Sequence, residues 1–191
     1  MDTLKPTGNL EIWTIDDDGN EELHFAEHNV ITTGMGIGLA HLFSGSGAGN
    51  VSDFQILNFQ VGTGGNLANY GASSVSLNTA LTSAQYSSPG SDLLLEELRI
   101  YKGTNLSTAE AIARIPFSNI QRVSKSSVRF NLVLDKYTAN DLSVDLNEVG
   151  LFMRNPHGSL IANPILVAYR PFTSLKKTST YSLLFKWTIK F

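Results

Sequence analysis

Alternation of apolar and polar residues is strongest at the end of the chain. From Tyr181 to Phe191 every second residue is large and apolar, and all but one of the residues between them are polar. Successive side chains of a β-strand point to opposite faces, so this spacing predicts a strand with one buried and one solvated face. We expect Phe191 to share the buried face, which places the terminal carboxylate at a sheet edge or a subunit contact.

Similar patterns predict further strands along the chain. Shorter alternating runs lie at residues 128–135 and 10–15. Runs bounded by Gly, Pro, Asn or Ser predict four more strands, at residues 54–61, 93–101, 149–153 and 165–169. Seven to nine strands without long helical patterns between them favour a mainly β fold, an antiparallel β-sandwich or barrel-like fold, in one domain over residues 1–191.

A turn signal separates the first two strands. Residues 16–20 read Asp-Asp-Asp-Gly-Asn, and Gly19 accepts the left-handed backbone geometry that a tight turn requires. The sequence therefore predicts a hairpin over residues 10–26. We interpret residues 1–28 as an N-terminal hairpin arm that can reach a neighbouring subunit.

One helix is predicted at about residues 33–43, with Thr32 or Thr33 as its N-cap. It contains Gly34, Gly36 and Gly38, each of which weakens a free helix by about 0.8–1 kcal/mol relative to Ala. Tertiary packing must therefore hold this helix, or a close neighbour must require the missing side chains.

Long polar stretches indicate loops. Residues 44–52 and 62–91 are rich in Gly, Ser and Asn. Loops above about 12–15 residues are uncommon in compact domains unless they are functional, so 62–91 is predicted to be an assembly contact. A capping-box spacing predicts a short second helix over residues 104–114.

Composition excludes several classes of function. The net charge is −3 and the chain contains no cysteine. The small negative charge argues against a nucleic-acid partner. The absence of cysteine excludes disulfides, thiolate metal sites and thiol catalysis. A signal sequence and long apolar windows are missing, so we expect neither export nor a membrane partner.

Metal-ligand patterns are incomplete. An EF-hand loop with Gly19 at its sixth position would need acidic ligands where Thr14 and Phe25 stand. His24 and His28 lie four residues apart in a predicted strand, which separates them by roughly 13 Å. We therefore expect no metal site and no cofactor.

The sequence also gives no basis for assigning a catalysed reaction. No catalytic motif is found, so no catalytic or cofactor-binding residue is predicted and the chain is expected not to be an enzyme. A hydrolase using Asp92, Glu96 or Glu97 is one alternative hypothesis. A glycan-binding module that stacks sugars on Trp13 or Tyr101 is another, although aromatic residues at strand spacing are more often buried core residues.

Several segments, taken in order, resemble small virion proteins of tailed bacteriophages. They are Asn29-Val30-Ile31-Thr32-Thr33-Gly34, Leu42-Phe43-Ser44-Gly45, residues 59–65, residues 146–152 and residues 182–191. The resemblance implies a non-enzymatic virion component of the tail, neck or baseplate, including fibre attachment, with a capsid decoration protein as the alternative. It also implies synthesis in the bacterial cytoplasm, other virion proteins as partners, and self-assembly, for which we expect a trimer or hexamer.

Overall fold

The structure is a computed structural model that describes residues 6–44, 55–62, 113–115, 117–137, 139–140, 145–153 and 165–191. These residues form nine strands, one α-helix (α1, Thr33–Ser44) and one 3-10 turn (Phe117–Asn119). The strands are β1 (Thr7–Ile15), β2 (Glu21–Ile31), β3 (Ile56–Gly62), β4 (Ala113–Arg114), β5 (Ile120–Ser124), β6 (Ser127–Leu134), β7 (Leu146–Met153), β8 (Ile165–Leu175) and β9 (Ser182–Lys190).

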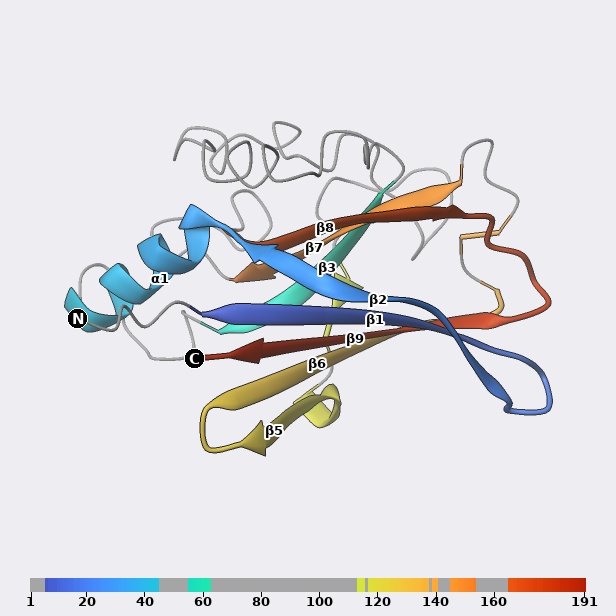
Figure 1. Ribbon diagram of the computed structural model, residues 1–191, viewed down its shortest axis with the longest axis horizontal. Helices are drawn as coiled ribbons and strands as arrows, with labels where there is room; N and C mark the ends of the chain where they lie inside the picture. Colours follow the sequence, from blue (N-terminus) through green and yellow to red (C-terminus); the bar gives the residue numbers. More distant parts are fainter. Residues whose placement is uncertain are drawn as a thin grey trace.

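All strand pairs are antiparallel, in the order β4-β3-β7-β8-β2-β1-β9-β6-β5. Within the described residues this order has two free ends, so the sheet is not a closed barrel. It folds into two layers, with β3, β7 and β8 in one and β1, β9, β6 and β5 in the other (Figure 1). The predicted mainly β, antiparallel, sandwich-like fold with one short helix is confirmed.

The core lies between the two layers. Phe59 of β3 packs against Phe185 and Trp187 of β9, with ring centroids 6.4 and 5.9 Å apart. Four other strands separate β3 from β9 in the sheet order, so these rings meet across the sandwich. The inward side chains of β9 are completely buried, as the alternation predicted; they are Leu183, Phe185, Trp187 and Ile189.

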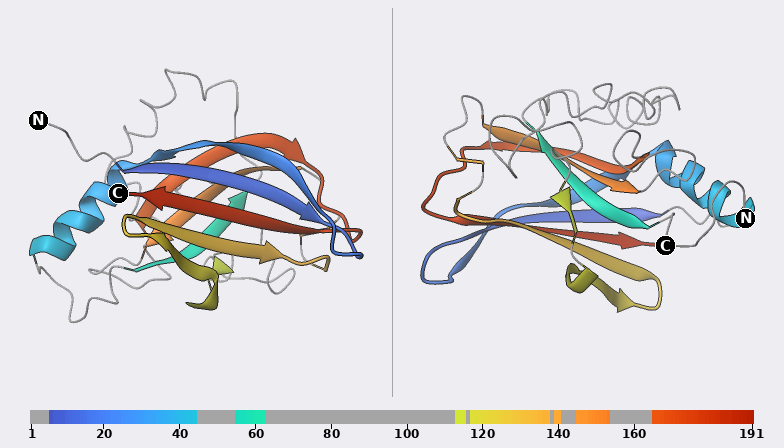
Figure 2. Two further views of the ribbon diagram at one scale, coloured as in Figure 1. Left: turned by 60° about the horizontal axis from the view of Figure 1, so that its bottom comes forward. Right: turned by 180° about the vertical axis from the view of Figure 1, so that it is seen from behind.

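The two layers join at a short seam between β2 and β8. These strands pair only at Val30 with Tyr169 and at Ile31 with Ala168. The seam ends where Pro171 of β8, which has no N–H, follows Arg170. The part of β2 that precedes the seam diverges from β8 and pairs with β1 in the other layer (Figure 2).

Arg170 links the two strands where their backbone pairing stops. Its Nη1 donates to the His28 carbonyl at 2.8 Å, its guanidinium pairs with Glu27, and it lies 5.2 Å from the centroid of the Phe25 ring. Burial lowers the pKa of Arg170 to about 10, so the side chain stays charged at neutral pH. The Arg170 side chain therefore donates to β2 beyond the last backbone pair, next to Pro171, which has no N–H of its own.

The predicted hairpin is confirmed as β1 and β2, but it is part of the main sheet. β1 pairs with β9 from Thr7 to Ile15, and Leu10 and Ile12 are completely buried. One flank of the hairpin is bound along its whole length by β9, so the predicted arm of residues 1–28 includes a strand of the main sheet. Only its turn projects beyond the sandwich (Figure 1), and its contact with a neighbouring subunit stays a prediction.

Asp16 organises this turn. Its carboxylate accepts hydrogen bonds from the Asn20 side chain and from the backbone N–H groups of Asn20 and Asp18, while Gly19 has a φ of 81°. These bonds, led by that of the Asn20 side chain, stabilise the charged form and lower the pKa of Asp16 below its ordinary value.

The stabilisation provided by Asp16 is expected to depend on pH. A lowered folded-state pKa contributes stability above the unfolded pKa of about 3.9, and this contribution disappears as the pH falls through the folded-state value. Asp16→Asn should therefore reduce the free energy of unfolding at pH 7 more than at pH 3, measured by urea denaturation. Asp18→Asn is the control, and an equal loss at both pH values would contradict the assignment.

Helix α1 confirms the predicted segment, and β8 fixes its start. The Thr32 hydroxyl donates to the Leu166 carbonyl at 2.5 Å, and the Thr32 N–H donates to Val167 at 3.1 Å. Thr32 precedes the helix as expected of an N-cap residue, but its hydroxyl anchors the chain to β8. Met35 and Leu39 pack on the core between the layers.

One sequence prediction is wrong in part, and several others fall on residues outside the described part of the chain. The prediction of a helix over residues 104–114 is wrong for its last two residues. Ala113 and Arg114 form strand β4 and pair with Phe59 and Asn58 of β3. The other residues of this predicted helix lie outside the described part of the chain, as do the strand predicted at 93–101 and all but the first residue of each predicted loop, 44–52 and 62–91.

Phe191 is not buried as the alternation predicted. It is 40% exposed, and its N–H donates to the Ser126 carbonyl at 2.8 Å, just beyond the last pair of β9 with β6. β9 lies between β1 and β6, so the C-terminal residue stands at the end of a central strand and not at a lateral edge of the sheet.

Candidate functional site

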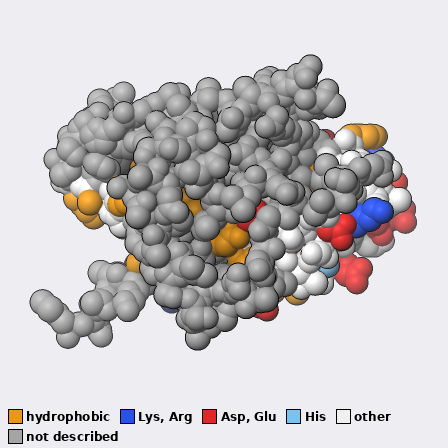
Figure 3. Space-filling view, turned by 90° about the horizontal axis from the view of Figure 1, so that it is seen from above, with side chains coloured by type: hydrophobic (Ala, Val, Ile, Leu, Met, Phe, Trp, Pro, Cys, Tyr) orange, Lys and Arg blue, Asp and Glu red, His pale blue; other side chains and the backbone are white. Residues whose placement is uncertain are grey.

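The two ends of the sandwich differ in chemistry. Acidic side chains gather at the right-hand end in Figure 3, around the β1–β2 turn. Helix α1 and the end of β9 lie at the opposite end (Figure 1). A hollow lies at each end, and these two hollows suit different kinds of ligand.

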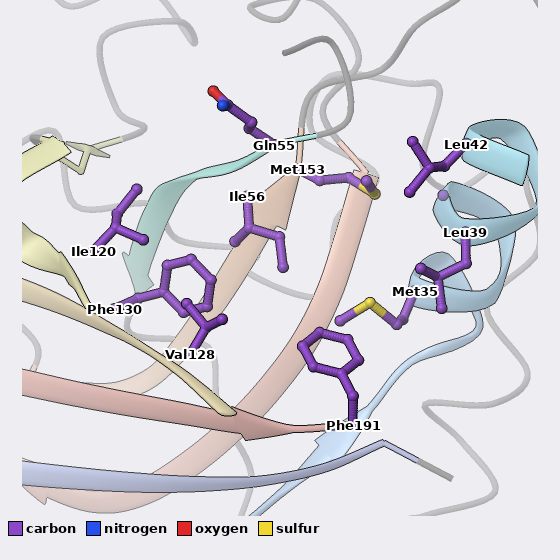
Figure 4. Close-up of a pocket in the computed structure, with 11 residues that line it drawn as sticks. Met35, Leu39, Leu42, Gln55, Ile56, Ile120, Val128, Phe130, Met153 and Phe191 are labelled. Carbon is purple, nitrogen blue, oxygen red and sulfur yellow. The ribbon is translucent and has the colours of Figure 1, made fainter. Parts of the chain in front are cut away.

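The hollow beside α1 is an apolar groove of about 290 Å³. Side chains from both layers and from the helix converge on it (Figure 4). Gln55 is the one described lining residue with a polar side chain. The other lining residues are Met35, Gly38, Leu39, Leu42, Ile56, Ile120, Val128, Phe130, Met153 and Phe191.

Gly38 allows the helix to approach the wall of the groove. A Cβ atom at this position would lie 2.1 Å from Sδ of Met153. Phe191 lies opposite the helix, and its ring is directed toward Met35 (Figure 4). Methionine side chains are flexible and polarisable, so two of them let the groove adapt to the shape of an apolar group.

Large apolar side chains are exposed near the groove. Phe43, in the last turn of α1 and next to Leu42 of the groove, is 83% exposed. With the 40% exposed Phe191, it gives this end two phenylalanine rings in contact with solvent. Large exposed apolar patches mark protein contacts, and this end combines an apolar groove with two exposed rings.

The second hollow is a polar cleft of about 580 Å³ between the β1–β2 turn and the β8–β9 connection. Glu22 and His24 line one side, and Lys176 and Tyr181 line the other. The Tyr181 hydroxyl donates to the Lys176 carbonyl, which fixes the connection. The cleft combines carboxylates with hydroxyl groups, but its described residues form no acid, base and nucleophile arrangement.

The histidines of β2 do not form a site together. His24 Nε2 lies 3.5 Å from the Thr173 carbonyl oxygen, while the backbone carbonyl of His28 accepts from Arg170. Within the described ranges, no cluster of three or more His, Asp or Glu side chains is arranged to hold a metal ion. Asp92, Glu96, Glu97 and Tyr101 lie outside those ranges.

The two tryptophans differ in accessibility. Trp187 is completely buried and belongs to the core. Trp13 is partly buried, donates from Nε1 to Glu11 at 3.0 Å, and has Lys186 Nζ 4.6 Å from its ring centroid. One face of the Trp13 ring is therefore already occupied by a cation, which does not favour it as a sugar-stacking platform.

Buried polar residues are the feature that sequence patterns missed. Lys177 is only 2% exposed, and its ammonium donates to Asn140 Oδ1 at 2.9 Å and to the Thr178 carbonyl at 2.7 Å. Burial lowers its pKa. Glu148 is also fully buried, and accepts from the Tyr169 hydroxyl at 2.7 Å. Both residues appeared in the sequence as ordinary polar positions.

The hydrogen bond of Glu148 joins neighbouring strands, because Tyr169 belongs to β8. Gly150 itself pairs regularly with Gln60 and Tyr169, and the register shifts of β7 against β8 lie on either side of it.

Comparison with known proteins gives no family for this chain. No protein-family model matches it, and no curated protein or solved structure shows significant similarity. The α-helix of the described region is too short to cross a membrane.

Proposed function

We propose that this chain is a non-enzymatic structural protein of a tailed bacteriophage particle, which assembles with copies of itself in the tail, neck or baseplate. The observation that carries this proposal is the apolar groove beside α1 together with the exposed rings of Phe43 and Phe191. The resemblance of residues 29–191 to small virion proteins supports the same role.

The proposed mechanism is burial of this apolar end against another protein. Each buried Å² of apolar surface contributes about 25 cal/mol, and stable interfaces bury about 1,200–2,000 Å² in total. The antiparallel sandwich supplies a rigid support, because its core is closed by large rings such as Trp187 and Phe59. Function then resides in contacts and requires no reacting group.

Light scattering coupled to size-exclusion chromatography tests the proposal. The wild-type chain is expected to form one defined oligomer, a trimer or hexamer. Phe43→Ser should shift the protein toward monomer, because a serine at this position buries much less apolar surface. Tyr137→Ser is the matched control, since Tyr137 is also strongly exposed, at 79%, but follows Lys136, which pairs with Asp17 of the β1–β2 turn at the other end of the sandwich.

A wild-type monomer at every protein concentration, or an equal effect of both substitutions, would contradict the proposed contact. Immunogold labelling of purified particles then determines the location. Label on the tail, neck or baseplate supports the proposal, whereas label spread over the capsid surface identifies a decoration protein instead.

A further inference from the structure

The β1–β2 hairpin carries a concentrated negative charge. Residues 7–31 contain seven Asp and Glu residues and no Lys or Arg, although the whole chain has a net charge of only −3. Three of these carboxylates form ion pairs within the chain: Asp17 with Lys136, Glu21 with Lys186 and Glu27 with Arg170. Asp18 and Glu22, at the tip, have no cationic partner among the described residues.

The β5–β6 hairpin has the opposite charge. Between residues 117 and 134 there are three basic residues, Arg122, Lys125 and Arg129, and no acidic one. Lys190 adds a fourth, because Ser127 at the start of β6 pairs with it. In the described part of the chain none of these four cations pairs with a carboxylate. Arg122 donates only to the backbone of its own turn, and Arg129 to the Thr188 hydroxyl.

Strand register places the two charged hairpins at opposite ends of β9. Ile15, beside the acidic turn, pairs with Ser182, whereas Ser127, beside the basic turn, pairs with Lys190. Eight residue steps separate Ser182 from Lys190, which corresponds to about 26 Å of strand. The described part of the chain is therefore dipolar along this strand, with an acidic hairpin at one end and a basic hairpin at the other.

The basic hairpin also borders the apolar groove. Ile120 of β5 and Val128 of β6 line the groove, and Phe191 follows Lys190. This end thus has an apolar centre with a cationic rim, the arrangement expected of a protein interface. The charge of the rim indicates an acidic partner, and the hairpin tip at the other end of the same chain is acidic.

We propose that the acidic β1–β2 tip of one copy docks against the basic β5–β6 end of the next copy. This inference rests on the proposed function, and it names the contact by which the oligomer forms. Because the two surfaces differ and lie at opposite ends of one protomer, the contact is head-to-tail. Such heterologous contacts close into rings when the rotation between copies allows it.

Salt gives the first test, by light scattering or sedimentation velocity on the full chain. Raising the NaCl concentration from about 0.1 M to 1 M shortens the Debye length from about 10 Å to 3 Å, so self-association should weaken roughly tenfold. Lys125→Glu should weaken it at low salt by a similar factor. Lys176→Glu, which makes the same change of charge at the acidic end, is the matched control and should not weaken association, because it adds negative charge beside the acidic tip.

Mixing two charge-reversed chains gives the second test. One chain carries Asp18→Lys and Glu22→Lys, and the other carries Lys125→Glu and Lys190→Glu. All four positions are exposed, so both chains should fold, which circular dichroism checks. Each chain alone should be monomeric. An equal mixture should assemble with the two chains alternating, because each acidic end again meets a basic one, and such an assembly closes only into even-numbered rings such as a hexamer.

The outcomes separate the contact from the proposed function. Recovery of assembly only in the mixture supports the head-to-tail contact. A wild-type oligomer that neither charge reversal nor salt weakens overturns this contact but leaves self-assembly in place. A wild-type chain that stays monomeric at low salt overturns both the contact and the proposed self-assembly.

Discussion

Trp187→Ala is expected to cost about 3–5 kcal/mol of the free energy of unfolding, the range for removing a large aromatic side chain from a packed core. Trp187 is completely buried, and its ring lies 5.9 Å from that of Phe59 on the opposite layer. Its loss therefore opens a cavity between the two layers. Urea denaturation followed by circular dichroism measures the change.

Two further substitutions make this test specific. Trp187→Phe should cost much less, because it keeps an aromatic ring and removes an indole N–H that has no hydrogen-bond partner in the described structure. Trp13→Ala should also have a small effect, since Trp13 is only partly buried. A cost below about 1 kcal/mol for Trp187→Ala would show that the layers do not pack through this residue.

Gly34→Ala is expected to destabilise the protein by about 2–3 kcal/mol, as overpacking of a close contact does. A Cβ atom on Gly34 would lie 2.0 Å from the Leu166 carbonyl oxygen and 2.9 Å from Ile165 Cγ2. The carbonyl belongs to strand β8 and also accepts the Thr32 hydroxyl, so it cannot move away without cost.

Gly36→Ala is the matched control, two residues further along the same helix. A Cβ atom there meets nothing within 4 Å, and Ala favours helix by about 0.8–1 kcal/mol relative to Gly. This variant should therefore be more stable than the wild type in the same denaturation experiment. Equal effects of the two substitutions would mean that helix propensity, and not the contact with β8, determines the result.

The environment of the three glycines in α1 was only partly predictable from the sequence. The sequence indicated that the helix needs packing or a close neighbour that excludes side chains. The structure confirms a close neighbour at Gly34 and Gly38, which approach Leu166 and Met153, but not at Gly36. The distinction was not predictable, because the neighbours come from β8 and β7, more than one hundred residues away in the chain.

The candidate site was less predictable than the fold. Residue patterns pointed to Phe191 and to the first hairpin as contact elements, but they predicted a buried Phe191. The groove joins side chains from α1, β3, β5, β6 and β7 with Phe191. No local pattern brings these elements together, because their meeting depends on how the sheet folds over itself.

The sequence by itself determined where most described strands, the first turn and the helix lie. Alternation fixed which face of β9 is buried, and the residues from Asp16 to Gly19 fixed the turn, because both effects act between near neighbours in the chain. Only the tertiary structure decided the strand order, the seam at Arg170, the apolar groove and the separation of charge between two ends. These features arise from pairing between distant segments, and an alternating pattern shows that a strand has a partner without showing which partner it is.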